Sequence, residues 1–212
     1  MALDRVALLV IGNGRLDYLH DTVDSALAWC PEFDHYLMVD DSGDGTVRRE
    51  LDRYYPDFQI HHNDQNRGMA HAVQQGFYMV LDTDADYVLW LEEDMRIMAE
   101  LPLLYSRRIL ATNPHVAQML YQRQCLTPQE HEAGSVVGAM AGTDHGWWTE
   151  HRHIFSLNPC LIPRRTLERG WPQGNEREMT DLLIKDGWTF GVWNKGPLVE
   201  HVGVVRGKQW QL

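Results

Sequence analysis

Short apolar runs and helix-like spacings alternate along the first half of the chain. Four runs have the length of buried strands, the third being the weakest: Val6–Ile11, Tyr36–Val39, Gln59–His62 and Tyr87–Leu91. Between them, apolar residues recur at three- and four-residue intervals, as on one face of a helix, in segments 16–27, 47–51 and 69–80. This alternation predicts right-handed crossovers and a mostly parallel sheet with helices on both faces.

The second half of the chain is less regular. Helices are predicted near Pro102–Thr112 and Glu176–Lys185, and strands near Val116–Tyr121, Phe155–Ile162, Thr189–Val192 and Leu198–Val202. A Gly- and Trp-rich stretch at Gly134–Trp148 separates the first two predicted strands. Since no repeat, low-complexity segment or linker interrupts the chain, we expect a single compact α/β domain over residues 1–212.

Composition excludes several classes of protein. The 212 residues are 44% hydrophobic and 23% charged, as in ordinary globular proteins, and the net charge of -11 disfavours general binding to DNA, RNA or anionic lipid. Cys30, Cys125 and Cys160 are too few and too widely spaced for a disulfide framework. We find neither a signal peptide nor an apolar run of the ~18 residues that span a membrane. These features predict a soluble, cytoplasmic protein.

Polar clusters follow three of the predicted strands: Gly12-Asn13-Gly14, Asp40-Asp41 and Glu92-Glu93-Asp94. Ligands of parallel α/β sheets bind at the carboxyl ends of the strands, so we expect the clusters to meet in one site. Three adjacent carboxylates repel one another and call for a positive group beside them. A divalent cation such as Mg²⁺ or Mn²⁺ is the economical candidate, and a solvated acidic turn is the alternative.

The order and spacing of these clusters resemble those of GT-A glycosyltransferases, particularly family 2. Four segments are similar to the nucleotide-binding strand and turn, the Val-Asp-Asp-x-Ser segment, the Asn-x-Gly helix start and the D-x-D-like cluster of that family: Val10–Arg15, Val39–Ser42, Asn66–Gly68 and Glu92–Asp94. The resemblance implies a Rossmann-like GT-A fold. It further implies that residues 1–100 bind a nucleotide sugar and that residues 101–212 hold the acceptor and the catalytic groups.

The resemblance also implies roles for single residues. It places Asp40 or Asp41 at the base, Glu93 near the ribose, and Mn²⁺ or Mg²⁺ on Asp94 and on His201 of a His-x-Gly element. The full set implied to bind the nucleotide sugar is Ile11, Asn13, Arg15, Asp40, Asp41, Arg67, Gly68, Glu92 and Glu93. A solvated arginine is the alternative for Arg67, and a structural histidine for His201. Basic residues follow His201 and could neutralise the leaving diphosphate: Arg206 and Lys208.

Segment Gly170–Leu182 is similar to the family's Gly-aromatic segment and its Glu-Asp-x-Asp-Leu helix start. Inverting members commonly use the Asp of the Glu-Asp pair as general base, and Met179 stands at that position here. The candidates to take the proton of an acceptor hydroxyl are then Glu178, next Glu176, and third Asp181. For all three, the alternative is that they merely complement a helix N-terminus.

The Gly- and Trp-rich stretch carries two further features. One group of residues could form a zinc site: Asp144, His145, His151 and His153. Their spacing matches no common zinc motif. Trp147 and Trp148 are adjacent and cannot both face one core from a strand. An exposed tryptophan there would stack on a sugar or a base, or contact another subunit.

We therefore expect a metal-dependent glycosyltransferase that moves a sugar from a UDP- or GDP-sugar to a hydroxyl, with inversion favoured. The acceptor stays open between a small molecule, a protein and a modified nucleic-acid base, and so does a homodimer; a membrane partner is not expected. One alternative is a sugar nucleotidyltransferase, which would need a longer Gly-rich first loop than Gly12–Arg15. The other is an inactive nucleotide-sugar-binding module, which Met179 allows.

Overall fold

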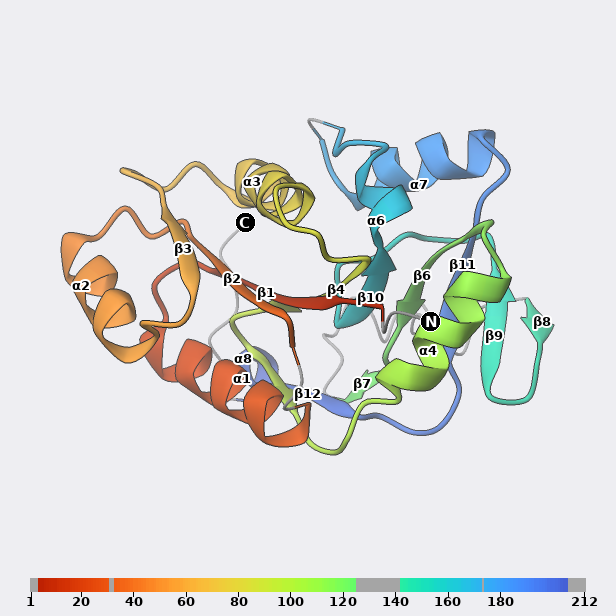
Figure 1. Cartoon of the computed structure of the whole chain (residues 1–212), viewed down its shortest axis with the longest axis horizontal. Coiled ribbons are helices and arrows are strands. Elements are labelled where there is room, and N and C mark those ends of the chain that lie inside the picture. The colour runs from red at the N-terminus through yellow and green to blue at the C-terminus, as the bar shows by residue number, and fades with distance from the viewer. Residues whose placement is uncertain (1–3, 31–32, 125–141, 173, 206–212) are drawn as a thin grey trace.

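The first half of the chain alternates strands and helices, as its apolar pattern predicts. The computed structural model describes residues 4–30, 33–124, 142–172 and 174–205 (Figure 1). Its first elements are β1 (Val6–Gly12), α1 (Leu16–Trp29), β2 (His35–Asp40), α2 (Gly45–Tyr54), β3 (Gln59–His62), α3 (Met69–Leu81) and β4 (Tyr87–Glu92). These four strands are parallel, in the order β3-β2-β1-β4, which confirms the predicted parallel arrangement.

The second half extends this sheet with strands of both directions. Its elements are β5 (Met95–Ile97), α4 (Leu103–Thr112), β6 (Val116–Leu120), β7 (Arg123–Gln124), β8 (Thr143–Asp144), β9 (Trp148–His151), β10 (Cys160–Pro163), α6 (Arg164–Leu167), α7 (Glu176–Lys185), β11 (Thr189–Trp193), β12 (Val199–His201) and α8 (Val202–Val205). The nine-stranded sheet continues from β4 as β10-β6-β11-β9-β8. β10 is antiparallel to both of its neighbours, whereas β6 and β11 are parallel to each other.

Helices cover both faces of the nine-stranded sheet. All seven residues of β1 are buried, and their side chains alternate between two apolar cores. Val6, Leu8 and Val10 share one core with α1, α2 and α4, and the intervening residues share the other with α3, α6 and α7. Figure 1 shows these two sets of helices on opposite sides of the sheet. The α/β fold class with helices on both faces is confirmed.

A second, three-stranded sheet brings the C-terminal part of the described chain back to the end of β4. Its order is β5-β12-β7, and His201 in β12 pairs with Met95 in β5. Met95, Ile97 and Val199 belong to the core on the α1 face. His201 is thereby carried next to Asp94, the residue between β4 and β5.

The predicted strand over Phe155–Ile162 is wrong in its first half, because only its end lies in β10. The backbone N–H groups of residues 155–157 bond instead to side chains of neighbouring elements. Those acceptors are Oγ1 of Thr180, Oε1 of Gln118 and Oε1 of Glu176. Buried donors need partners, but these partners come from side chains, so the segment is apolar and buried without forming a strand.

No helix among the described residues is long and apolar enough to cross a membrane. Cys30 and Cys160 are buried free thiols, and Cys125 lies outside the described residues.

His151 should make folding stability depend on pH. Its side chain is only 3% exposed, and burial, aided by the charge of His153, lowers its pKa from 6.5 to about 4. Because the unfolded chain binds the proton more tightly, the stability is complete above pH 6.5 and falls by up to about 3 kcal/mol as the pH drops to 4. In urea titrations from pH 7.5 to 4, His151→Phe should lose this part of the pH dependence. Identical pH slopes for the two proteins would contradict the assignment.

Candidate functional site

The three polar clusters meet at one edge of the sheet. Register pairs Gly12 with Asp40 and Ile11 with Glu92, so the ends of β1, β2 and β4 are level. A small cleft opens at these ends, which we call the donor cleft after the role that the resemblance implies, and its lining residues are Ile11, Gly12, Asn13, Asp41, Asn66, Gly68, Met69, Ala72 and Glu92. Five of the nine residues implied to bind the nucleotide sugar therefore line one cleft: Ile11, Asn13, Asp41, Gly68 and Glu92.

Asp41 ties the start of α3 to the end of β2. Its Oδ1 accepts hydrogen bonds from Asn63 Nδ2 at 2.6 Å and from the Arg67 backbone N–H at 2.9 Å, and its Oδ2 accepts from the Gly68 N–H at 2.8 Å. Gly68 has φ +84°, where a side chain would be strained. Asn66 Nδ2 donates to Asn13 Oδ1 at 2.6 Å and links this turn to the end of β1. Asp41 therefore supplies the negative charge that the N-terminus of α3 favours.

Asp40 lies behind the donor cleft, where it is buried. Its Oδ1 accepts from the Ser42 N–H at 3.0 Å, and its Oδ2 lies 2.8 Å from His62 Nδ1. His62 Nε2 in turn lies 3.0 Å from Asp52 Oδ1 of α2. Of the two adjacent aspartates, Asp41 is the one that lines the cleft.

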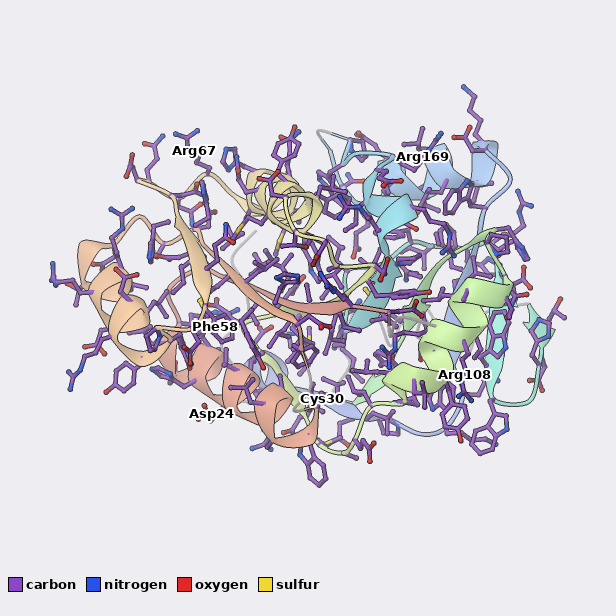
Figure 2. All side chains as sticks on the ribbon, viewed as in Figure 1. Asp24, Cys30, Phe58, Arg67, Arg108 and Arg169 are labelled. Carbon is purple, nitrogen blue, oxygen red and sulfur yellow. The ribbon has the colours of Figure 1, made fainter. Side chains whose placement is uncertain are left out.

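The Arg67 side chain is exposed at the surface. Figure 2 shows it at the outer edge of the molecule, between β3 and α3. Its backbone N–H makes the contact with Asp41 described above.

Glu92 faces the cleft from the end of β4. Burial, together with the charges of Asp94 and Glu176, raises its pKa to about 8, while Arg123 and Arg15 oppose the shift. It is the member of the acidic cluster that lines the donor cleft.

Glu93 points into the protein and braces the connection between β1 and α1. Its Oε1 accepts from Arg15 Nε at 2.6 Å, and its Oε2 accepts from the N–H groups of Asn13 at 2.8 Å and Arg15 at 3.2 Å. Burial raises the pKa of Glu93, and Arg15 offsets part of that rise. Arg15 is thus the positive group expected beside the acidic cluster.

Asp94 is completely buried and has two basic neighbours. Its Oδ2 accepts from Arg15 Nη2 at 3.0 Å and lies 3.2 Å from His201 Nε2. Burial alone would raise the pKa of Asp94, but the hydrogen bond and charge of His201, together with Arg15, hold it below its usual value. The two residues implied to hold a metal are therefore adjacent in space although 107 positions apart.

Arg123 orients His201. Its Nη1 lies 2.8 Å from His201 Nδ1, and a guanidinium can only donate, so Nδ1 accepts and Nε2 carries the proton toward Asp94 in the neutral ring. Arg123 Nε also donates to Asn158 Oδ1 at 2.7 Å. Arg123 was not among the residues predicted for the site, because it lies in a two-residue strand without a motif.

Asp94 fits a divalent metal ion, and His201 would join it only after Arg123 moves off Nδ1, so that the ring proton shifts there and leaves Nε2 free for the ion. Asp94 Oδ1 is buried and has no hydrogen-bond partner among the described residues, so one carboxylate oxygen is left for a cation. Within that same part of the chain, no group of three or more His, Cys, Asp or Glu side chains is arranged to hold a metal. Mg²⁺ and Mn²⁺ commonly take one or two carboxylates and fill their remaining positions with substrate phosphates and water. Two protein ligands suit that mode of binding.

Gly203 of the His-x-Gly element lets Asp94 and His201 approach. A methyl group added at its Cα would overlap Oδ2 of Asp94 and come within 3.4 Å of His201 Nε2. Any larger residue would push the carboxylate out of its place. The His-x-Gly element therefore needs glycine at position 203, because any side chain there would collide with Asp94.

A larger cleft of about 510 Å³ adjoins the donor cleft, and its volume suits a small ligand. We call it the acceptor cleft, after the expectation that the second half of the chain holds the acceptor, and its lining residues are Met69, Ala70, Glu92, Ile154, Leu157, Asn158, Trp171, Gly174, Asn175, Glu176 and Arg177. Glu92 and Met69 line both clefts, so the two adjoin there.

The three candidate bases differ in their surroundings. Glu176 is half-buried in the acceptor cleft, and its Oε1 accepts from the Leu157 N–H at 2.5 Å and from Ser156 Oγ at 3.1 Å. Glu178 is exposed, with its carboxylate against the backbone of Gly174. The third candidate, Asp181, is exposed and lies 3.5 Å from Arg177 Nε. Met179, at the family's base position, is fully buried in the apolar core.

The residues considered for zinc do not converge. His145 stacks on Trp148, with ring centroids 4.4 Å apart, whereas the His151 ring is buried beside Phe190 and His153. Asp144 Oδ1 accepts from the Gly146 N–H. The adjacent tryptophans separate as expected, with Trp148 buried and its neighbour exposed. Arg206 and Lys208 lie outside the described residues.

Solved structures of similar fold include a mannosyltransferase and a protein in complex with UDP. TarS from S. aureus (residues 1–349) has a TM-score of 0.62 and 13% identity, covering 92% of this chain and 60% of that one. The same protein in complex with UDP has a TM-score of 0.59. The mannosyltransferase PcManGT from Pyrobaculum calidifontis, in complex with GDP-Man and Mn²⁺, has a TM-score of 0.66 and 17% identity over 94% of this chain and 57% of its own. This chain thus spans about three fifths of their length.

No protein of curated function matches the chain in sequence. The sequence model described as "Glycosyl transferase family 2" matches residues 10–182. That segment runs from β1 into α7 and includes both clefts. The chain therefore belongs to glycosyl transferase family 2.

Proposed function

We propose that the protein is a metal-dependent glycosyltransferase that moves a sugar from a nucleotide-diphosphate sugar to a hydroxyl group. The observation that carries the proposal is that Glu92 lines both clefts: Glu176 lines the acceptor cleft with it, and Asp94, two residues further along the chain, is in contact with His201. UDP and GDP-Man in the structures of similar fold support a UDP- or GDP-sugar as donor. Residues 1–100 would bind the donor, and residues 101–212 would bind the acceptor.

Asp94 and His201 would hold Mn²⁺ or Mg²⁺, and the ion, when bound, supplies positive charge that stabilises a departing diphosphate. Arg15 keeps Asp94 ionised and turned toward His201. Arg123 sets the orientation of the imidazole from its other side. Glu93 holds Arg15 and the end of β1 in place. Arg15 and Glu93 thus pre-organise Asp94, whereas Arg123 would have to release Nδ1 before Nε2 of His201 binds the ion.

Glu176 replaces Glu178 as our preferred base, because it is the candidate that lines the acceptor cleft. The Leu157 N–H and the Ser156 hydroxyl hold its Oε1, so the carboxylate is oriented before an acceptor binds. Its carboxylate would take the proton of the acceptor hydroxyl as the oxygen forms a bond to the anomeric carbon. The bond from that carbon to the donor phosphate breaks, and its electron pair leaves with the diphosphate. Attack on the face of the anomeric carbon opposite the diphosphate would invert the configuration.

Nucleotide binding tests the proposal directly. Saturating UDP or GDP with Mn²⁺, at about 100 times its Kd, should stabilise the protein by about 2.7 kcal/mol and raise its Tm by about 5 to 10 °C. The shift should be smaller without Mn²⁺, and ADP and CMP serve as comparison nucleotides. A flat Tm for all four nucleotides, together with no heat of binding in calorimetry, would refute the proposal.

An inactive nucleotide-sugar-binding module is the second candidate, and the burial of Met179 at the family's base position favours it. Both candidates predict nucleotide binding. Only the glycosyltransferase predicts release of nucleoside diphosphate that increases with an acceptor. Acceptor-stimulated release therefore separates them.

A further inference from the structure

An exposed indole lies beside the carboxyl end of β11 and lines neither cleft. Trp147 is 61% exposed, and its ring centroid lies 5.9 Å from that of Trp193, which is 6% exposed, with 31° between the ring planes. Lys195 Nζ lies 4.9 Å from the centroid of the Trp147 ring. We call these three residues the tryptophan platform. Single exposed apolar side chains are common, but an indole backed by a second indole and a cation is a built arrangement.

Hydrogen bonds hold the platform in place. The Asn194 N–H donates to the Trp147 carbonyl at 2.9 Å, and Asn194 Nδ2 donates to Asp144 Oδ1 at 3.2 Å. Thr149 Oγ1 donates to Asn194 Oδ1 at 3.0 Å. Because both turns that carry the platform are tied together, little further order has to be created when a ligand stacks on Trp147.

The platform lies at the same end of the strands as the two clefts but on the other face of the sheet from the acceptor cleft. Trp193 packs in the core on the α1 face, whereas Leu157 and Trp171 of the acceptor cleft pack in the core on the α3 face. β6 and β11 run in the same direction as β4, because the antiparallel β10 stands between β4 and β6. Trp193 is the last residue of β11, as Glu92 is of β4, and three strand spacings of ~4.8 Å place them about 14 Å apart. Gln122 Nε2 donates to the Trp193 carbonyl at 2.9 Å, and the next residue, Arg123, holds His201.

The chemistry around Trp147 suits a carbohydrate. A sugar ring presents apolar C–H groups on its face and hydroxyl groups around its rim, so it pairs with an aromatic face that has polar neighbours. The residues around Trp147 are exposed and mostly polar or small: Asp144, His145, Gly146, Lys195 and Gly196. A second protein chain would call instead for a wider apolar patch.

We infer that the tryptophan platform binds a sugar unit of an oligosaccharide acceptor, at a distance from the hydroxyl that reacts. The inference rests on the proposed function and names a substrate class for it: an acceptor that is itself a glycan. Stacking on Trp147 would hold the distal part of that glycan, while its reacting end enters the acceptor cleft.

An array of immobilised neutral and phosphorylated oligosaccharides, probed with the labelled full chain, tests this inference. The unchanged protein should bind a subset of them, and Trp147→Ala should bind that subset about 10-fold more weakly or not at all. Trp147→Phe, which keeps an aromatic face, should recover most of the binding. Trp29→Ala is the matched control, because Trp29 is 45% exposed and lies at the end of α1, and it should bind as the unchanged protein does.

Three outcomes would overturn the inference: no oligosaccharide bound by the unchanged protein, equal binding by Trp147→Ala, or a dimer in light scattering that Trp147→Ala converts to a monomer. The last would show that a second copy covers the indole. The thermal shift with UDP or GDP should be the same in all four proteins. Loss of glycan binding with an unchanged nucleotide shift is therefore distinguishable from failure of the proposed function.

Discussion

Replacing Asp94 by asparagine should lower Mn²⁺-dependent sugar transfer by about 100-fold or more. Asp94 supplies the buried carboxylate oxygen without a hydrogen-bond partner among the described residues, and a neutral amide oxygen is a weaker ligand for a hard divalent cation. Release of nucleoside diphosphate, measured over a range of Mn²⁺ concentrations, gives the effect on activity. Binding of Mn²⁺ itself, followed by electron paramagnetic resonance, gives a readout that does not depend on turnover.

Glu200→Gln is the matched control for Asp94→Asn. Glu200 precedes His201 in β12, and its carboxylate pairs with Arg96 outside the clefts. We expect this variant to bind Mn²⁺ and to transfer sugar as the unchanged protein does. Because Asp94 is buried beside Arg15, the Tm of both variants must be compared as well. Unaltered Mn²⁺ affinity in a folded Asp94→Asn protein would remove Asp94 from the metal site.

Glu176→Gln should lower transfer by about 10²- to 10⁴-fold while leaving the nucleotide-induced thermal shift intact. Glutamine keeps a side-chain oxygen for the Leu157 N–H and Ser156 hydroxyl, so the change removes the basic group with little loss of structure. The measurement is single-turnover transfer from a donor whose binding is saturated.

Two neighbouring carboxylates on α7 provide the comparison for Glu176. Glu178→Gln and Asp181→Asn should transfer at close to the unchanged rate, because both side chains are exposed and neither lines the acceptor cleft. A large loss in Glu178→Gln with normal transfer in Glu176→Gln would assign the base to Glu178. Normal transfer in all three variants would place the base outside this helix.

The sequence predicts well those elements that have a capping residue or a regular apolar pattern of their own. α7 begins and ends where predicted, since Asn175 caps its first turn through its side chain and apolar residues recur on one face. The continuous apolar run of β1 likewise predicts a strand buried on both sides. β12 lies within the strand predicted near Leu198–Val202, whereas the three-residue β5 has no pattern of its own, and the pairing of the two strands across the chain leaves no local signal.

The roles of adjacent acidic residues could be predicted only as a group. Neighbouring side chains at a strand end point in different directions, so Glu92 faces the clefts while Glu93 turns inward to Arg15. Similarity to the family motif favours Glu178 as base. The structure favours Glu176 instead, because Glu178 is exposed whereas Glu176 lines the acceptor cleft. These distinctions depend on tertiary packing, which the spacing of residues along the chain does not contain.

The pairing of Arg15 with Asp94 also bears on the order in which the protein can assemble as it is synthesised. These two residues are 79 positions apart, and His201 follows Asp94 by a further 107. Arg15 can therefore neutralise the aspartate while the strand that carries His201 has yet to leave the ribosome. An unpaired buried carboxylate would be costly at that stage. The late segment then adds His201 to a carboxylate that already has one basic neighbour.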